Sequence, residues 1–399
     1  MREGWETTKL GAISEIFRGG SPRPIKSFIT QEADGINWIK IGDTEVGGKY
    51  IYSTEEKIRK EGMRSSRYVE PGDFLLSNSM SFGRPYILKT DGCIHDGWLV
   101  IKKYDRSLVQ DFLYYLLLSP LVAKQFEEGA RGSTVRNLNT DIVSNVVVSY
   151  PVSQIEQQRI VDILDREFAK IDALKANAEK SLQAAKDLFK SALEAKVFAK
   201  GGSNRLLSSV CLSITDGDHM PPPKSTNGVP FITISNIDKN KYEIDFTDTF
   251  FVPETYFLNL KEDRKPKKGD VLYTVTGSFG IPVVISVDRD FCFQRHIALI
   301  RPNQSIVLPE FIFYWAMTRR VLHIADEVAT GTAQRTVSLK SLRNFPIPVV
   351  SLDEQETIVD ECKKLFSKGK VIQQNYQKTL TLCDDLKQSL LRKAFNGEL

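Results

Sequence analysis

The stretch that decides the fold is PGDFLLSNSMSFGRP, Pro71 to Pro85. It aligns without gaps on KGDVLYTVTGSFGIP, Lys268 to Pro282, at a distance of 197 residues. Seven of the fifteen positions are identical, where about one identity is expected from amino-acid composition. Internal self-similarity at a fixed distance indicates a repeated architecture. The match therefore indicates that the 399-residue chain contains one unit twice.

Further matches on both sides of this stretch keep the same order and nearly the same distance, between 193 and 199 residues. Such a distance indicates a duplication with small insertions in loops. Two halves of this size also agree with the length, because a domain typically has about 150 residues. The matched segments are Leu10–Gly20 with Leu207–Gly217, Gly35–Asp43 with Gly228–Asn236, Cys93–Ile101 with Cys292–Ile300, Phe112–Leu116 with Phe311–Trp315, Gly132–Arg136 with Gly331–Arg335, and EQQRIVDIL from Glu156 with EQETIVDEC from Glu354.

Each half begins with short β-branched and aromatic runs that Gly, Pro, Asn and Asp interrupt, such as INWIKI and WLVIKK in the first half and PFITIS and HIALI in the second. Runs of this kind are typical of strands. One short apolar helix is expected in each half, at Phe112–Leu118 and Phe311–Met317. The sequence therefore predicts an α+β fold with two tandem mixed α/β domains, at residues 1–151 and 201–349.

A long helix is expected after each domain, at residues 152–200 and 350–399. Ser153 with Glu156, and Ser351 with Glu354, form capping boxes at the start of these proline-free segments. Apolar residues then recur every seven positions, which is typical of two long helices packed on each other; a two-fold relation between the halves would make them antiparallel. The alternative is two unrelated surface helices. The residues expected in the helix pair are Ile160, Leu164, Ile171, Leu174, Leu188, Ile358, Leu365, Ile372, Leu386 and Leu390.

The composition is that of an ordinary globular protein, with 41% hydrophobic and 26% charged residues. The formal net charge of +4 does not by itself indicate a nucleic-acid partner. The five cysteines include no CxxC pair, which favours a reducing compartment over a disulfide framework. No apolar run approaches the roughly 18 residues of a membrane span, and residues 1–10 lack the apolar centre of a signal peptide. These features predict a soluble, cytoplasmic protein.

Catalytic and metal-binding motifs are missing from the sequence. It has no GxxxxGK[ST] phosphate loop and no GxGxxG after a predicted strand. The four histidines do not stand at metal-ligand spacing. Asp216, Asp218 and His219 resemble a metal cluster, but the corresponding loop of the first half holds no acid, which favours a loop role. The sequence therefore predicts no catalytic residue and no metal site.

Polar turns recur at equivalent places in the two halves, while framework residues such as Phe82 and Phe279 are shared. Taken singly, a polar cluster is more often a solvated turn than a binding site. However, Arg, Lys, Asn, Gln, Ser and Thr are the side chains that contact base edges and phosphates. A duplicated framework with different loop side chains suits two readers of two different DNA targets. The candidate DNA-binding residues are Arg18, Ser21, Arg23, Lys26, Ser77, Asn78, Ser79, Ser81, Arg84, Arg131, Ser133, Thr134, Arg136, Asn137, Asp218, His219, Lys224, Thr274, Thr276, Ser278, Thr332, Gln334, Arg335 and Thr336.

The chain resembles the specificity (S) subunit of type I restriction-modification systems. The resemblance covers nearly the whole chain and rests on GDFLLSNSMSFGRP and GDVLYTVTGSFGIP, on the GSTVRNL and GTAQRTV turns that lead to YPVSQIEQQRIVDIL and IPVVSLDEQETIVDE, and on the terminal KAFNGEL. It implies two target-recognition domains that each bind one half of a split DNA sequence. It also implies a coiled-coil helix pair that sets the spacing of the domains and docks modification (methyltransferase) subunits.

The resemblance further implies two modification subunits per chain, and restriction subunits joined through the complex. It implies no catalytic residue and no cofactor on this chain, because S-adenosylmethionine, ATP and Mg²⁺ are expected on the partner subunits. Two alternatives stay open: a scaffold whose domains bind proteins or glycans instead of DNA, and a methyltransferase or nuclease with an unrecognised site.

Overall fold

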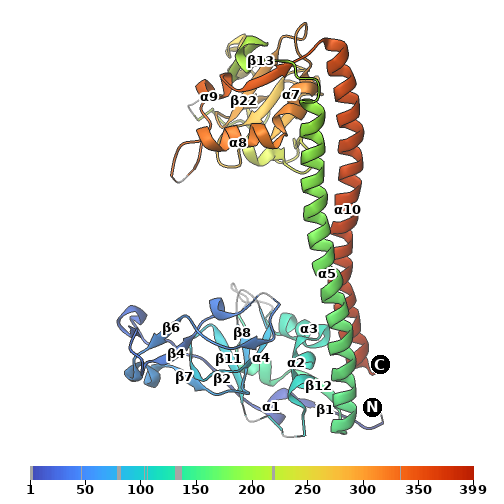
Figure 1. Ribbon diagram of the computed structural model, residues 1–399. Helices are drawn as coiled ribbons and strands as arrows, with labels where there is room; N and C mark the ends of the chain where they lie inside the picture. Colours follow the sequence, from blue (N-terminus) through green and yellow to red (C-terminus); the bar gives the residue numbers. More distant parts are fainter. Residues whose placement is uncertain are drawn as a thin grey trace. The chain divides into compact units, whose positions relative to one another are not determined.

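The structure is a computed structural model that describes residues 3–45, 47–78, 82–102, 104–105, 107–130, 137–217, 221–332 and 334–399. The chain forms two compact units, Met1–Asn177 with Thr379–Leu399, and Ala178–Lys378 (Figure 1). Each unit contains one mixed α/β domain and one stretch of each long helix, α5 (Gln154–Val197) and α10 (Leu352–Asn396). The predicted α+β fold is confirmed, and the linear domain boundaries stay a prediction.

The first domain is built on two five-stranded sheets and one two-stranded sheet. Its strands are β1 (Trp5–Lys9), β2 (Glu15–Arg18), β3 (Ile29–Thr30), β4 (Ile36–Ile39), β5 (Tyr50–Ile51), β6 (Glu56–Ile58), β7 (Arg67–Val69), β8 (Phe74–Ser77), β9 (Pro85–Leu88), β10 (Gly92–Ile94), β11 (Trp98–Lys102) and β12 (Val147–Pro151). The sheet orders are β2-β11-β8-β9-β5, β3-β6-β4-β10-β7 and β1-β12. Strands β8 and β9 are buried on both faces, which explains their unbroken apolar runs FLLS and PYIL.

Four short helices complete the first domain: α1 (Leu10–Ile13), α2 (Gln110–Leu118), α3 (Pro120–Gly129) and α4 (Thr140–Ser144). Helix α2 confirms the predicted apolar helix, whereas α3 and α4 were not predicted. Helix α3 begins directly after α2 because the buried Ser119 accepts a hydrogen bond from the Val122 N–H, 3.4 Å away. Phe112 of α2 packs edge-on against Phe395 of α10, with ring centroids 5.4 Å apart.

The second domain repeats this plan with shorter sheets. Its strands are β13 (Ser203–Leu206), β14 (Cys211–Asp216), β15 (Val229–Ile232), β16 (Ile237–Asp238), β17 (Glu243–Ile244), β18 (Phe250–Val252), β19 (Val271–Thr274), β20 (Pro282–Val284), β21 (Cys292–Phe293), β22 (Ile297–Pro302) and β23 (Pro346–Val349). The sheet orders are β14-β22-β19-β20, β18-β15-β21, β13-β23 and β16-β17. The helices are α6 (Glu254–Leu258), α7 (Pro309–Ala316), α8 (Arg319–Val328) and α9 (Leu339–Arg343). The order β14-β22-β19-β20 corresponds to β2-β11-β8-β9.

One glutamine on each long helix ties that helix to the domain of its own unit. Gln157 on α5 and Gln355 on α10 are fully buried and correspond at a distance of 198 residues. Each side chain accepts one backbone N–H and donates to two backbone carbonyls. The bonds of Gln157 are to Val109 N (2.8 Å), Ser107 O (3.1 Å) and Pro151 O (2.8 Å), and those of Gln355 are to Leu308 N (2.9 Å), Ile306 O (2.9 Å) and Val350 O (2.9 Å).

The two long helices run antiparallel within each unit. In the first unit, Lys175 pairs with Asp384 at 2.6 Å and Asp172 pairs with Lys387 at 2.5 Å. In the second unit, Lys196 pairs with Glu361 at 2.9 Å and Lys200 pairs with Glu354 at 3.3 Å. Residue numbers on α10 fall as those on α5 rise, which is the signature of an antiparallel pair. The Ser351–Glu354 capping box is present, with the Ser351 N–H donating to Glu354 Oε2 at 3.2 Å.

The predicted packing residues divide into two groups. Ile160, Leu164, Ile171 and Ile358 are buried, and Leu365 and Leu390 pack partly buried against the domain cores. The prediction was wrong for Leu174, Leu188, Ile372 and Leu386, which are 45–71% exposed. One seven-residue row of each helix stays buried, with Leu164, Ile171 and Ala178 on α5 and Cys362 and Cys383 on α10. The exposed residues lie three positions after members of these rows and therefore on a neighbouring face of the helix, because successive residues are about 100° apart. Ion pairs also connect α5 with α10.

No helix among the described residues is both long enough and apolar enough to cross a membrane.

Candidate nucleic-acid interface

In the first unit, three candidate residues converge on the turn between β10 and β11. Ser21 Oγ donates to Asp96 Oδ1 at 2.8 Å, the Arg23 guanidinium lies 3.6 Å from Asp96 Oδ2, and Arg18 Nε donates to Asp96 O at 3.4 Å. The Ser21 hydroxyl, more than the nearby cations, holds the pKa of Asp96 below its usual range. The Asp96 carboxylate thus orients a polar cluster whose two arginines are exposed.

His95 fixes the backbone of the same turn. Its Nδ1 accepts the Gly97 N–H at 2.8 Å, and its Nε2 lies 3.3 Å from the Ile41 nitrogen. Burial lowers the pKa of His95 and so favours the neutral imidazole. Gly19 passes so close that a Cβ there would lie 2.1 Å from His95 O; Gly217 of the second unit has the same relation to Phe293 O, at 1.9 Å. Each turn is therefore held rigidly against its first polar loop.

Three predicted DNA-binding residues hold the framework instead, and for them the prediction was wrong. Ser77 and Thr274 correspond, are at most 1% exposed, and accept a backbone N–H across the following turn, from Arg84 at 3.2 Å and from Ile281 at 3.0 Å. Asn78 is 3% exposed and donates to Asp96 O at 2.8 Å. Their hydroxyl and amide groups satisfy buried backbone atoms, which polar residue type alone does not reveal.

In the second unit, the candidate residues line a groove of about 380 Å³ at the corresponding turn. Thr276 and Thr336 form an antiparallel bridge, with their hydroxyl oxygens 3.2 Å apart. Gln334 lies beside them, and Arg295 and His296 enter from the turn between β21 and β22. The groove combines hydroxyl, amide, imidazole and guanidinium groups with one carboxylate, that of Asp216. These are donors and acceptors of the kinds that contact base edges and phosphates.

Arg295 occupies the place that Asp96 holds in the first unit. It is exposed, and its Nε donates to His296 Nε2 at 3.4 Å. Gln294 Nε2 lies 3.0 Å from His296 Nδ1. Burial, followed by the nearby Arg295 charge, lowers the pKa of His296 and favours a neutral ring that can accept the guanidinium N–H. The side chain that reaches outward from this turn is therefore basic in one unit and acidic in the other.

The remaining candidates are scattered. Arg335 pairs with Asp326 at 2.5 Å, and Lys224 lies 5.2 Å from the Phe250 ring centroid. Arg84 lies over the Tyr86 ring, and its buried Nε has no hydrogen-bond partner among the described residues. Lys26, Asn137 and Thr332 are exposed, and the Ser278 carbonyl accepts the Thr274 hydroxyl. Ser79, Ser81, Arg131, Ser133, Thr134, Arg136, Asp218 and His219 lie outside the described residues.

Asp96, Arg295 and His296 were missed by the sequence reasoning. A signal for them was present, because the matched segments Cys93–Ile101 and Cys292–Ile300 differ in their centres, HDG against QRH. Three consecutive residues that differ between two otherwise similar segments indicate a turn whose side chains are specific to each half. No group of three or more His, Cys, Asp or Glu side chains in the described parts of the chain is placed to hold a metal ion.

Comparison with known proteins gives one consistent family. The sequence model described as "Type I restriction modification DNA specificity domain" matches residues 2–184 and 220–380. The specificity subunit of the type I restriction enzyme EcoBI from Escherichia coli is 22% identical over 426 residues, which cover 100% of this chain and 87% of that protein. The specificity subunit of MjaIX from Methanocaldococcus jannaschii is 23% identical over 420 residues and covers 99% and 93%, respectively.

Two solved structures share the fold. A chain from a study of assembly and conformational transition in a type I R-M system has a TM-score of 0.77 and 20% identity, covering 100% of this chain and 99% of that chain. The HsdS subunit from Thermoanaerobacter tengcongensis has a TM-score of 0.54 and 21% identity, covering 100% and 98%.

Proposed function

Since the chain belongs to the type I restriction-modification DNA specificity family, we propose that it is the DNA-recognition subunit of a type I restriction-modification complex. Each domain reads one half of a bipartite DNA target. The turn between β10 and β11 and the turn between β21 and β22 carry the outward side chains that distinguish the two halves. The chain acts by recognition and supplies no catalytic residue.

The observation that carries this proposal is the contrast between Asp96 and Arg295 on matched turns. An acidic side chain accepts a hydrogen bond from cytosine N4, whereas arginine donates to guanine O6 and N7 and attracts phosphate. Opposite charges on matched turns are expected when one scaffold reads two different sequences. A groove that combines a guanidinium with other hydrogen-bond donors is better suited to DNA than to the alternative of a protein-binding scaffold.

The proposal extends to partners and cofactors. The relatives are named as specificity subunits of type I restriction enzymes. The working complex contains modification and restriction subunits, and we propose two modification subunits per chain. The antiparallel stretches of α5 and α10 set the spacing and dock the modification subunits. S-adenosylmethionine, ATP and Mg²⁺ belong to the partners, and the complex acts in the cytoplasm. A net charge of only +4 fits a subunit whose partners supply part of the phosphate-neutralising charge.

Domain exchange tests the proposal. Residues 1–150 are replaced by the corresponding segment of a relative, and methylated positions are mapped genome-wide in cells that carry the modification subunits. We expect one half of the methylated sequence to change while the other half stays the same. The matched control exchanges residues 203–349, which should change the other half. An unchanged target after both exchanges would favour the protein-binding scaffold.

A further inference from the structure

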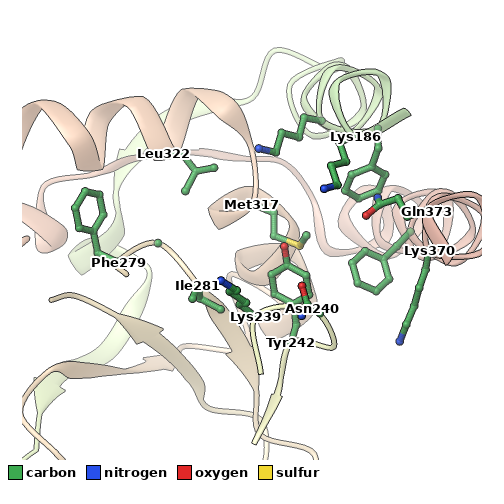
Figure 2. Close-up of a pocket in the computed structure, with 14 residues that line it drawn as sticks. Lys186, Lys239, Asn240, Tyr242, Phe279, Ile281, Met317, Leu322, Lys370 and Gln373 are labelled. Carbon is green, nitrogen blue, oxygen red and sulfur yellow. The ribbon is translucent and has the colours of Figure 1, made fainter. Parts of the chain in front are cut away.

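A cavity of about 390 Å³ lies in the second unit, away from the groove that contains Arg295 (Figure 2). Helix α5 contributes Lys186 and Lys190, α10 contributes Lys370, and the turn after β16 contributes Lys239. The wall is apolar and includes Met317 and Leu322, both labelled in Figure 2. Four lysines and no carboxylate line this cavity.

The positive charge of the rim is balanced only in part within the unit, since the charge of Lys190 contributes to the lowered pKa of Asp187. None of the four lysines has an ion-pair partner within 4.0 Å among the described residues. The nearest carboxylates in sequence are engaged elsewhere: Asp187 binds Arg319 at 2.7 Å, and Asp238 accepts two backbone N–H groups of its own turn. The rim therefore attracts an acidic group from outside the chain.

The corresponding place in the first unit is neutral. At a distance of 198 residues, Lys186 corresponds to Asp384 and Lys370 corresponds to Asp172. These two aspartates pair there with Lys175 and Lys387, whose counterparts in the second unit are Gln373 and Phe189. The first unit thus has two ion pairs between its long helices, where the second unit has lysines beside aromatic side chains. Because the second unit lacks the two carboxylates, a ligand that supplies carboxylates would complement these lysines.

The wall indicates that this ligand also has an apolar part. Phe189 and Tyr242 both pack edge-on against Phe366, with ring centroids 5.9 and 5.7 Å away. Tyr242 has a φ of 58°, a left-handed conformation that residues other than glycine rarely adopt and that is often found at functional sites. The three rings form an apolar wall of the cavity. A small ion bound at the lysines would not cover this wall, which would stay in contact with water.

A phosphate group is the weaker candidate for the ligand. Phosphate sites in proteins use free backbone N–H groups at helix N-termini or nests. Here the N–H groups of Tyr242, Gly280 and Ile281 already donate to Asp238 O, Thr274 O and Thr274 Oγ1. The backbone of duplex DNA also presents no apolar surface to cover the partly exposed Leu322. Carboxylates on a chain that carries apolar side chains satisfy both the rim and the wall.

We propose that this cavity binds an acidic peptide segment of a partner protein, anchored by one or two apolar side chains, and that it does so once per chain. The inference rests on the proposed function, because it assumes a multisubunit complex. It goes beyond that function, because a site present in only one unit distinguishes the two ends of an otherwise repeated protein.

The first test measures association of the full chain with the modification subunit of its own system. The rim variant K186Q/K190Q/K239Q should bind at least tenfold more weakly and with a smaller salt dependence. The control variant K261Q/K268Q/K340Q removes the same charge from exposed positions of the second domain, outside α5 and α10, and should bind within twofold of the unaltered chain. The wall variant L322Q, checked for an unchanged unfolding midpoint, should weaken binding about fivefold. Equal binding by the rim and control variants overturns the proposal.

The second test identifies the occupant. A photoreactive benzophenone amino acid replaces Gln373 at the cavity, and the assembled complex is irradiated with and without DNA. We expect one cross-linked peptide that is rich in Asp and Glu and is attached once per chain. Cross-linking only to DNA, to a basic segment or to no protein overturns the proposal. Methylation of a bipartite DNA site by the same complexes is measured in parallel. If the unaltered complex does not methylate such a site, the proposed function is contradicted. If methylation is normal but no acidic peptide is cross-linked, only this inference is contradicted.

Discussion

Asp96 in the first unit and Arg295 in the second stand at the same place, two residues before strands β11 and β22. Gln157 and Gln355 also correspond, but they are the same residue and make the same three kinds of hydrogen bond. The two pairs of residues differ because their side chains have different hydrogen-bond partners. The glutamines satisfy buried backbone groups, so a replacement leaves those groups unpaired. The turn residues point outward, so the two copies can differ there without loss of the fold.

The largest expected effect comes from breaking the shared framework. Gln157→Leu leaves one backbone N–H and two carbonyls without a partner, and Gln355→Leu does the same in the second unit. Each substitution should lower the free energy of unfolding by about 3 kcal/mol. Denaturant unfolding of the full chain measures it. The neighbouring Gln158 is exposed, so Gln158→Leu should cost less than about 0.5 kcal/mol. If Gln157→Leu costs no more than this control, the glutamine does not hold the domain.

The second-largest effect is expected at a buried ion pair, where the second unit has an arginine and the first unit has a lysine. Arg301 binds Asp270 at 2.8 and 3.0 Å and also donates to two backbone carbonyls, whereas the first unit has Lys102 and Asp73 at these positions. Arg301→Lys keeps the charge but loses the hydrogen bonds to the carbonyls of Glu262 and Lys265, of which the Glu262 carbonyl keeps the Lys265 N–H as a donor. We expect a loss of about 2 kcal/mol in unfolding free energy.

The control for this prediction is Arg289→Lys, at an exposed position, with an expected change within about 0.5 kcal/mol. A neutral Arg301→Lys would mean that the second unit accepts the lysine of the first, and that the bonds to the carbonyls contribute nothing.

The sequence predicted the duplication, the fold class and the two long helices, because these depend on repeated strings and on patterns of local spacing. The duplication was readable because Gly72, Phe82 and Pro85 recur at positions that turn or pack the backbone. The heptad pattern predicted the helix pair but assigned part of the contact to the wrong row, because spacing alone does not show which of two neighbouring rows faces the partner helix. Leu188 is 71% exposed although it fits the pattern.

The candidate site was predicted only in part. Polar turns led to Ser21, Thr276 and Gln334, which lie at the two turns, and their contact with DNA stays a prediction. The same signal failed for Ser77 and Asn78, because a buried polar side chain that satisfies the backbone looks identical in sequence to an exposed one. Asp96 was missed because it lies far from Ser21 and Asn78 in sequence and meets them only through the pairing of β11 with β2 and β8.

A third prediction sharpens the contrast between the two turns in DNA binding. Arg295→Ala should weaken binding of the assembled complex to its target about tenfold, and should lower the slope of log affinity against log salt by about 1 if Arg295 contacts phosphate. Asp96→Asn should keep total affinity within about twofold, because it removes a charge that repels phosphate, while it reduces discrimination among first half-site variants. Competition binding with single-base variants measures both.

Exposed arginines away from the turns provide the control for this pair. Arg289→Ala should leave both affinity and discrimination unchanged. The same result for Arg295→Ala would remove the second turn from the interface, and unchanged discrimination in Asp96→Asn would restrict Asp96 to positioning Ser21 and Arg23.

The smallest effect concerns pH. Burial lowers the pKa of His95, and its Nδ1 accepts a backbone N–H, so the folded first unit resists protonation at this ring. The unfolded chain takes up that proton below about pH 6.5. The contribution of His95 is therefore fully present above about pH 6.5 and is lost as the pH falls from there toward the lower folded-state pKa. The second unit has Gln294 at this position, and its turn histidine is His296, whose pKa burial also lowers.

His95→Gln should therefore reduce the loss of stability between pH 7.5 and 5.5, by less than about 1 kcal/mol because the ring is partly exposed and solvent screens its charge. Unfolding midpoints at both pH values measure the difference. His323 is 72% exposed on α8, so His323→Gln is a control that should keep the pH dependence of the unaltered chain. If His95→Gln loses as much stability between pH 7.5 and 5.5 as the unaltered chain, the acid sensitivity arises from other residues. Glutamine and histidine would then support the first turn equally well at both pH values.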